Sequence, residues 1–271
     1  MVRDITLGQY FPGNSPLHRM DPRAKIVLLV AFIVFIFVGQ NFYALALMTV
    51  SVLAVVVMTG VPAGMYFKSL KMILFVILFT AVLNLFYGSG QVLWQWGFLR
   101  ITQGGVNNAI FIAVRIASLI LISSSLTFTT SPTDLTDGLE RLLKPLTVFH
   151  IKVHDLAMMM TIALRFVPTL LEETDKIMSA QKARGADMES GGLIQRVKAL
   201  IPILVPLFVS SFRRAYDLAM AMECRCYRGG QGRTRMKQLH LTAVDVWAVV
   251  LTAAVCAGVI LLNIFMPSIW A

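Results

Sequence analysis

Charged residues are scarce in this chain of 271 residues, and their scarcity sets its class. Asp, Glu, Lys and Arg together make up 14% of the residues, whereas 57% are hydrophobic, and the mean hydropathy is +0.75. A soluble globular protein of this size needs more polar surface than that. The composition therefore predicts an integral membrane protein.

Cysteine is also rare, with three in the chain. Cys224 and Cys226 are separated by one residue and Cys256 lies in an apolar run, so the three form no disulfide framework and predict a reducing, cytoplasmic face. A metal or redox pair at Cys224 and Cys226 is an alternative, although no second cysteine pair follows. We expect no cleavable leader, because residues 1–12 include charged residues and no apolar core.

Two catalytic signatures are missing as well. The chain has no Gly-x-x-x-x-Gly-Lys-Ser/Thr loop to hold a nucleotide and no His-Glu-x-x-His element. The carboxylate groupings at Asp134 with Asp137, and at Glu172-Glu173 with Asp175, also fit helix-start and solvent-facing charges. No internal repeat is visible. An intramembrane enzyme and a self-sufficient secondary transporter or channel are therefore alternatives that the residues do not favour.

Apolar runs predict five transmembrane helices. A single helix over residues 26–59 would be about 51 Å long, against a hydrocarbon core of about 30 Å, so two spans that turn at Gln40-Asn41 fit better. Further spans are expected at about 72–87, 106–129 and 241–265.

Basic residues are distributed unevenly around these spans. Residues 130–240 hold 16 of the 24 Lys and Arg residues, the N-terminal arm four and the loop 60–71 two. The positive-inside rule therefore predicts that the N-terminus and residues 130–240 are cytoplasmic, and that 88–105 is an outer loop or interfacial segment. The predicted domains are a membrane domain at 1–129, a cytoplasmic helical domain at 130–240 and the fifth span at 241–271.

Residues 130–240 form helices rather than a hydrophilic domain. A short amphipathic helix is expected from Ser131, as N-cap, up to Pro145. Two long helices follow, at about 153–184 and 193–227, ended by Gly185 and by Gly229-Gly230. The predicted fold class is thus an all-α integral membrane protein with about five transmembrane helices and a cytoplasmic domain of one short and two long helices.

Three ionisable residues lie at or near the expected membrane depth: Arg115, Arg165 and Asp245. Such residues raise the question of a functional site. We favour internal ion pairs, or side chains that reach the interface, as the explanation.

Two arginine triplets stand at the ends of the long helices: Ala183-Arg184-Gly185 and Cys224-Arg225-Cys226. Together with the opening segment Arg3–Tyr10, the element His18–Lys25 and the turn Thr130-Ser131-Pro132, they resemble the transmembrane T component of energy-coupling factor (ECF) vitamin transporters. The resemblance covers nearly the whole chain. It is closer to the shared-module branch than to the dedicated cobalt or biotin versions.

This resemblance implies a coupling subunit in a bacterial cell membrane that links two ATP-binding-cassette ATPases to one or more substrate-binding S components. The chain would bind no cofactor and no nucleic acid itself, since the ATPases hold ATP and Mg²⁺. Both triplets would dock into grooves of the ATPases, although Cys224 and Cys226 stand where Ala and Gly are usual. The plainer alternative is two solvated helix ends whose cations the helix dipole favours.

The long helices also carry methionines and prolines that suit an S-component interface: Met158, Met159, Met160, Pro202 and Pro206. Unbranched thioethers can repack against different partners, and prolines kink a helix. Ordinary core filling and purely structural kinks are the alternatives. The vitamin or metal that is carried does not follow from the residues.

Overall fold

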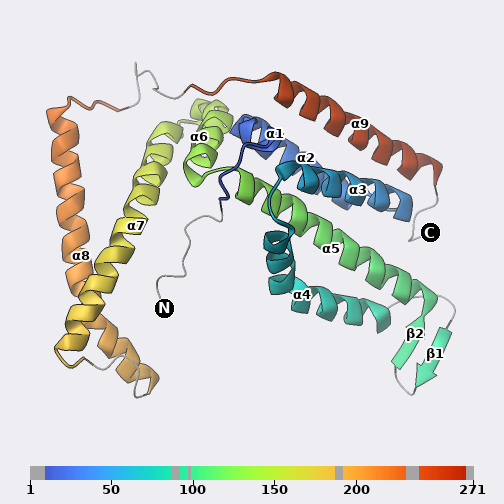
Figure 1. Ribbon diagram of the computed structural model, residues 1–271, viewed down its shortest axis with the longest axis horizontal. Helices are drawn as coiled ribbons and strands as arrows, with labels where there is room; N and C mark the ends of the chain where they lie inside the picture. Colours follow the sequence, from blue (N-terminus) through green and yellow to red (C-terminus); the bar gives the residue numbers. More distant parts are fainter. Residues whose placement is uncertain (1–9, 87–91, 97–98, 187–191, 230–237, 267–271) are drawn as a thin grey trace. The chain divides into compact units, whose positions relative to one another are not determined.

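The computed structural model describes residues 10–86, 92–96, 99–186, 192–229 and 238–266. Its elements, in chain order, are α1 (Pro16–Arg19), α2 (Pro22–Val38), α3 (Phe42–Thr59), α4 (Ala63–Phe86), β1 (Val92–Trp96), β2 (Leu99–Thr102), α5 (Gln103–Thr129), α6 (Pro132–Leu143), the 3₁₀ helix η1 (Lys144–Phe149), α7 (Val153–Ala183), α8 (Leu193–Cys224) and α9 (Ala243–Phe265) (Figure 1). They fall into two compact units. We call residues 8–141 with 238–271 the span unit, and residues 142–237 the long-helix unit.

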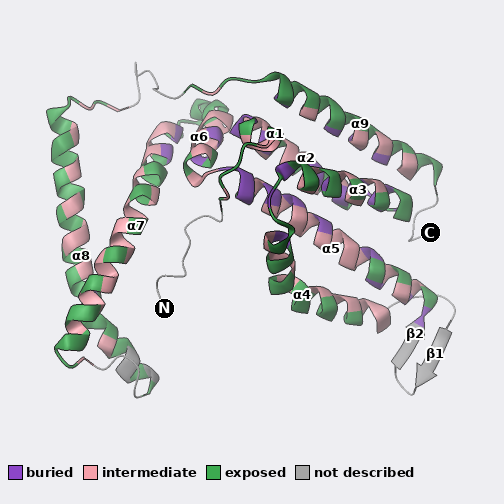
Figure 2. Ribbon diagram, viewed as in Figure 1, coloured by how far each residue is buried: buried purple, intermediate pink, exposed green. Residues whose placement is uncertain are grey.

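The core of the span unit lies among α2, α3, α5 and α9. Its buried side chains are Phe32, Ile36, Ala44, Met48, Val52, Ile122 and Val259. Buried residues follow the facing sides of these helices, whereas α4 contacts α5 and buries only Tyr66 among its described residues (Figure 2). Large apolar side chains cover the exposed faces, as expected where lipid is the solvent.

The apolar run 26–59 forms two helices, as predicted. Asp21 caps the first helix by accepting a hydrogen bond from the backbone N–H of Arg23, and Pro22 occupies the first helical position. The chain leaves α2 at Gly39 and enters α3 after Asn41. Gly60 ends α3 in the left-handed conformation, with φ 67°, which a residue with a side chain rarely adopts.

Polar contacts tie α9 to α2 at both ends. At one end the Asp245 carboxylate accepts a hydrogen bond from the Asp21 N–H at 2.9 Å. At the other, the Asn263 amide donates to the Val38 carbonyl, and the Asn41 amide donates to the carbonyls of Leu262 and Met266. Asp245 and Asn263 are eighteen residues apart, about 27 Å of helix. This length matches the hydrocarbon core of a bilayer, so α2, with 17 residues, is long enough to cross it.

Among the described helices with at least 18 residues, six are apolar enough to cross a membrane: α3, α4, α5, α7, α8 and α9. The predicted spans correspond to α2, α3, α4, α5 and α9, so the count differs in α2, α7 and α8. The last two are less apolar than the other four. The all-helical, multi-pass class is confirmed.

A short hairpin interrupts the helices between α4 and α5. β1 and β2 pair antiparallel, with Gln95 opposite Arg100 and Trp96 opposite Leu99. The segment predicted as an outer loop therefore contains two strands, and α5 begins at Gln103 rather than at Val106. The Thr102 hydroxyl accepts from the Gly105 N–H and sets this start.

The predicted boundary at residue 130 differs from the division that the structure shows. α6 begins as predicted, with the Ser131 hydroxyl accepting from the Asp134 N–H, but most of α6 belongs to the span unit. A Cβ added at Gly138 would lie 3.0 Å from the Cβ of Pro22, so α6 packs closely against the start of α2. The long-helix unit therefore begins at Leu142.

Candidate functional site: two arginine-capped helix ends

The first triplet forms a complete C-terminal cap on α7. Arg184 is the C-cap residue and Gly185 follows in the left-handed conformation, with φ 84°. The N–H of Gly185 donates to the Lys182 carbonyl at 3.0 Å, and the N–H of Ala186 donates to the Gln181 carbonyl at 3.0 Å. These two bonds define a Schellman motif, which satisfies carbonyls that the helix end leaves open.

The second triplet forms the same cap on α8 without a glycine. Cys226 takes the left-handed position, with φ 55°, and its N–H donates to the Glu223 carbonyl at 2.8 Å. The N–H of Tyr227 donates to the Met222 carbonyl at 3.0 Å. Arg225 thus occupies the same C-cap position as Arg184.

The predicted end of α8 was wrong. We expected the helix to continue to about Tyr227 and to end at Gly229-Gly230, because those are the first glycines after the triplet. The structure ends the helix at Cys224 and turns the chain at Cys226. A left-handed conformation costs a residue with a Cβ about 1–2 kcal/mol, yet the two Schellman bonds hold Cys226 in it. Gly229 has φ 84° outside the helix, and Gly230 lies outside the described residues.

All six residues of the two triplets are exposed: Ala183, Arg184, Gly185, Cys224, Arg225 and Cys226. Neither arginine forms an ion pair with a described residue. Because small side chains flank each guanidinium, a partner surface can approach both closely. A planar guanidinium presents five N–H donors, which suits carboxylates in a groove.

Three polar contacts show that α7 and α8 run antiparallel. The Tyr227 hydroxyl donates to the Met158 sulfur at 2.8 Å, Arg214 forms an ion pair with Glu173, and the Gln181 amide donates to the Pro202 carbonyl at 3.3 Å. As the residue number rises on α7, that of its partner on α8 falls. The two triplets therefore lie at opposite ends of the helix pair (Figure 1).

The ion pair lies midway between the triplets. Arg184 follows Glu173 by eleven residues, and Arg225 follows Arg214 by eleven residues. Each arginine is thus about 16 Å along its own helix from the same contact. The long-helix unit presents two equivalent basic ends on arms of equal length.

Residues 13–236 match the family CbiQ, described as cobalt transport protein. A protein from Ruminiclostridium cellulolyticum named energy-coupling factor transporter transmembrane protein EcfT is 52% identical over 263 residues, which cover 97% of this chain and 98% of the relative. The chain belongs to the EcfT family. Proteins of the same name from Clostridium kluyveri and Bacillus subtilis are 51% and 47% identical over 100% and 92% of this chain, and over 99% and 95% of their own lengths.

The family match confirms the resemblance that the sequence carried. Members are named as transmembrane proteins of a transporter, so the chain is a membrane subunit and not a member of a catalytic family. Of the motifs that indicated this family, residues 3–9 lie outside the described part of the chain. The others are described, and the element His18–Lys25 has a structural role.

That element joins three parts of the span unit. The Lys25 ammonium donates to the Thr129 carbonyl and to the Thr130 hydroxyl, each at 3.0 Å, at the end of α5. The Asp21 carboxylate forms an ion pair with Arg23, and the Asp21 backbone N–H donates to the Asp245 carboxylate. Burial by itself would raise the pKa of Asp21, but the hydrogen bonds and the charge of Arg23 outweigh it, so that pKa lies below 3.8.

The three ionisable residues of the expected spans have different surroundings. The Arg115 guanidinium donates to the Gly39 carbonyl at 2.7 Å and lies 4.5 Å from the Phe111 ring centroid, and it has no ion pair within the described residues. Asp245 forms a capping box with Thr242 at the start of α9. Arg165 is exposed. Of the two explanations expected for Arg115, the described residues do not support the internal ion pair, because a carbonyl and an aromatic face take the place of a carboxylate.

The long-helix unit also exposes a large apolar surface. Met159 and Met160 are 56% and 46% exposed, whereas Met158 is half-buried and accepts from Tyr227. Pro202 and Pro206 are exposed on α8. Around them lie further exposed apolar residues, namely Ile194, Val197, Leu200, Ile201, Leu204, Val205, Phe208, Val209 and Phe212. The sequence indicated the methionines and prolines but not this apolar face, whose signal was the dense apolar run 199–209.

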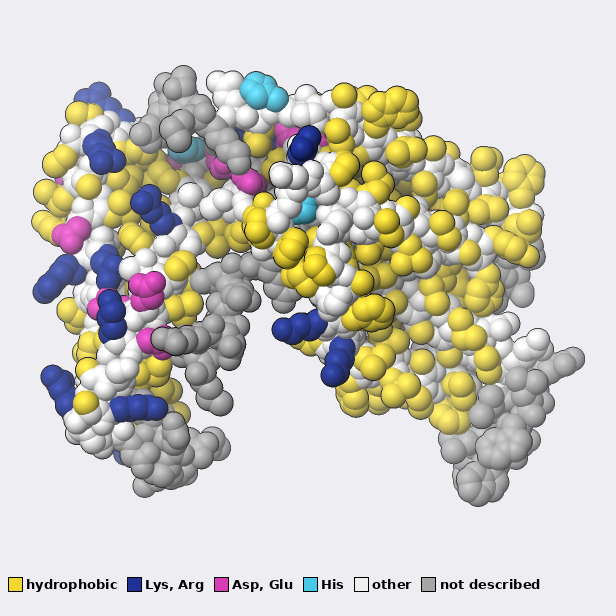
Figure 3. Space-filling model, in the orientation of Figure 1, with side chains coloured by type: hydrophobic (Ala, Val, Ile, Leu, Met, Phe, Trp, Pro, Cys, Tyr) yellow, Lys and Arg dark blue, Asp and Glu magenta, His cyan; other side chains and the backbone are white. Residues whose placement is uncertain are grey.

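Side chains of Lys and Arg are spread along α7 and α8, while hydrophobic side chains dominate the span unit (Figure 3). A helix pair that is both basic and apolar on its surface differs from a solvated cytoplasmic domain and from a lipid-facing span. An apolar patch of this size indicates a surface that another protein or a membrane covers.

Proposed function

We propose that this chain is the coupling subunit of an ECF-type importer for a vitamin or another micronutrient. In this proposal two ABC-type ATPases bind and hydrolyse ATP with Mg²⁺, a membrane S component binds the substrate, and this chain transmits motion between them. The observation that carries the proposal is the equivalence of Arg184 and Arg225. Two partner copies of one kind require two equivalent contacts, and the long-helix unit has a pair of them.

The two contacts have the spacing that two separate partners need. Each arginine lies about 16 Å along its helix from the Glu173–Arg214 ion pair, in opposite directions. One partner would have to extend about 33 Å along the helix pair to contact both. Two ATPases, one at each end, bind them without strain.

Each arginine would enter an acidic groove of its ATPase. Burial there replaces water by charge-assisted hydrogen bonds, and removing one partner of such a pair costs about 2–5 kcal/mol. An exposed surface pair is worth about 1 kcal/mol at most. This difference separates a docked arginine from a solvated helix end.

The exposed apolar face of α8, with Met159, Met160, Pro202 and Pro206, would receive the S component. The basic residues of the long-helix unit support a cytoplasmic position for this unit, and for the N-terminus, in a bacterial cell membrane. Sites for ATP on the ATPases and for the substrate on the S component leave this chain without a cofactor of its own.

The test is ATP-driven uptake by the chain reconstituted with two ATPases and an S component in vesicles. Arg184→Ala and Arg225→Ala should each reduce uptake at least tenfold, and the double variant should lose the ATPases on affinity purification. Arg228→Ala is the matched control, since Arg228 is exposed three residues after Arg225 and lies outside the cap. Normal uptake by the double variant, or equal damage by Arg228→Ala, would overturn the proposal.

A further inference from the structure

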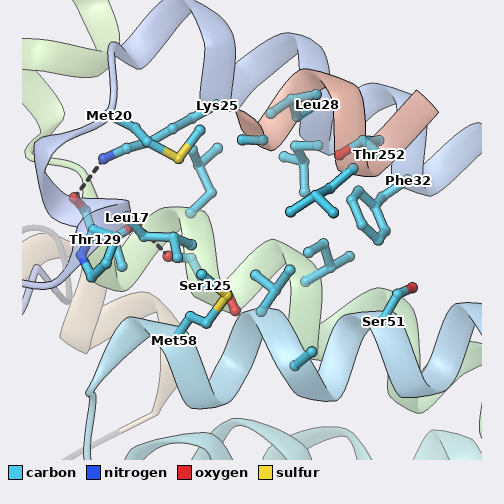
Figure 4. A pocket seen from close by; sticks show the side chains of 18 of the residues that line it. Leu17, Met20, Lys25, Leu28, Phe32, Ser51, Met58, Ser125, Thr129 and Thr252 are labelled. Atoms are coloured by element: carbon cyan, nitrogen blue, oxygen red, sulfur yellow. Dashed lines mark hydrogen bonds between the residues drawn. The ribbon is translucent and has the colours of Figure 1, made fainter. Parts of the chain in front are cut away.

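A cavity of about 330 Å³ lies inside the span unit, between α2, α3, α5 and α9. The short helix α1 closes one end with Leu17 and Met20, and Phe32, Met58 and Ile122 are among the side chains that line the space (Figure 4). The lining is almost entirely apolar. On α9 it extends from Val244 to Val255, which is eleven residues or about 16 Å along the helix.

The cavity lies between the C-terminal half of α3 and the N-terminal half of α9. Nearer the other end the two helices touch, since a Cβ added at Gly258 would lie 3.0 Å from Leu47. About one turn before Gly258 the cavity begins, and small side chains such as Ala54 and Ala248 form parts of its walls. At its mouth stand Trp247 and Leu251, which are 68% and 58% exposed.

These mouth residues belong to a membrane-spanning helix, so the opening faces lipid. Water has almost no polar partner inside, and apolar cavities stay dry. An empty cavity would leave its lining without contacts on one side, which forfeits dispersion energy. Hydrocarbon chains from the bilayer are present at the mouth and compatible with the lining. The lining residues also follow one another along the helix axes, the direction in which lipid tails run.

Positively charged side chains at the α1 end of the cavity suit the phosphate of such a lipid. Among the described residues that line the cavity, Lys25 is the one that carries a charge, and its ammonium lies at the α1 end, turned toward Thr129 (Figure 4). Arg19 is exposed on α1, directly before Met20, which lines the cavity. A phosphate at the membrane surface therefore meets a cation where the cavity ends.

We propose that this cavity binds one acyl chain of a phospholipid from the leaflet on the α1 side, with the phosphate beside Arg19. The bound chain fills the wedge between α3 and α9 and completes the packing of the span unit. The site is independent of the arginine triplets, and its test requires neither the ATPases nor the S component.

Native mass spectrometry of the full-length chain, purified in a mild detergent, tests the site. The wild-type chain should retain one phospholipid. Ala248→Phe and Ala54→Phe, which fill the cavity from opposite walls, should lower the lipid-bound fraction at least tenfold while the protein elutes as a single folded species. Val246→Phe is the control, because Val246 is 61% exposed and faces away from the cavity on α9. Retention of lipid by both cavity-filled variants, or no lipid on the wild type, would overturn the proposal.

Fluorescence quenching locates the bound acyl chain, and it tests the site even if neither cavity-filled variant folds. Trp247 is kept as the one tryptophan, and dibrominated phosphatidylglycerol is titrated into the detergent micelles. Quenching should saturate near one lipid per protein. In the matched variant Trp247→Phe with Val246→Trp, the tryptophan moves to the side of α9 that faces away from the cavity. Quenching should then rise without saturation. Equal curves for the two variants, or a second copy of the chain cross-linked through position 247, would contradict a lipid site.

Discussion

Glu173 and Arg214 form an ion pair at the point from which the two arginine-capped ends are equally distant along their helices. The pair lies on α7 and α8, and both side chains are about one-third exposed. Solvent therefore screens it, and its own contribution to stability is small. Its position matters more, because it marks the register of the antiparallel helices and hence the placement of Arg184 relative to Arg225.

The first prediction concerns this ion pair. Glu173→Gln and Arg214→Gln should each lower stability slightly, and a double-mutant cycle should give a coupling energy of about 0.5–1 kcal/mol. Thermal unfolding of the purified chain in detergent measures it. The exchanged variant, Glu173→Arg with Arg214→Glu, should restore the coupling. A coupling energy of zero would show that register depends on apolar contacts alone.

The second prediction concerns the left-handed residue that ends α8. Cys226→Gly should stabilise the last turn by about 1 kcal/mol, because glycine adopts a positive φ without steric cost. Amide hydrogen exchange should report it as stronger protection of the Cys226 and Tyr227 N–H groups. Cys224→Gly is the control of opposite sign, since Cys224 is the last helical residue and glycine there costs about 1 kcal/mol. The same change in protection for both variants would contradict the cap geometry.

The contrast between the two triplets shows how far the sequence leads. Gly185 marks the end of α7 because glycine is the usual residue there, and the helix ends where the pattern predicts. At Cys226 no such signal exists, and the backbone bonds from Cys226 and Tyr227 to the preceding turn decide the end. Local residue preferences therefore predicted one cap and failed for the other.

Features that depend on distant segments were not predictable from periodicity. The turn at Gln40-Asn41 was predicted from its polarity, but nothing near it in the sequence indicates that it binds the end of α9 more than 220 residues later. The packing of α6 against α2, and the cavity that five segments enclose, have the same origin. Periodicity shows which face of a helix is apolar and not which helix will cover it.

The third prediction concerns the asparagine contacts at that turn. Asn41 is 2% exposed and its amide donates to two carbonyls at the end of α9, so Asn41→Ala removes two hydrogen bonds between the turn and α9. We expect a loss of about 1–3 kcal/mol in the free energy of unfolding, measured by thermal denaturation in detergent. Asn84→Ala is the control, because Asn84 donates to the Thr80 carbonyl within its own helix. Equal losses for the two variants would show that the contact between the turn and α9 contributes nothing.

The last prediction concerns sidedness and uses the native thiols. Cys224 and Cys226 are exposed and free, whereas Cys256 is buried, so a membrane-impermeant maleimide should react with the α8 end alone. If the long-helix unit is cytoplasmic, labelling should occur in inside-out vesicles and not in intact cells. Gln40→Cys in a Cys224→Ser, Cys226→Ser background should show the reverse, because Gln40 is exposed just after the C-terminal end of α2, whereas the basic residues of the N-terminal arm lie at its start.

Addition of the ATPases should then protect Cys224 and Cys226, since a groove that receives Arg225 must cover both neighbours. Labelling of both sites from the same side would contradict the orientation that the basic residues predict, and unchanged labelling with the ATPases bound would place their contact elsewhere.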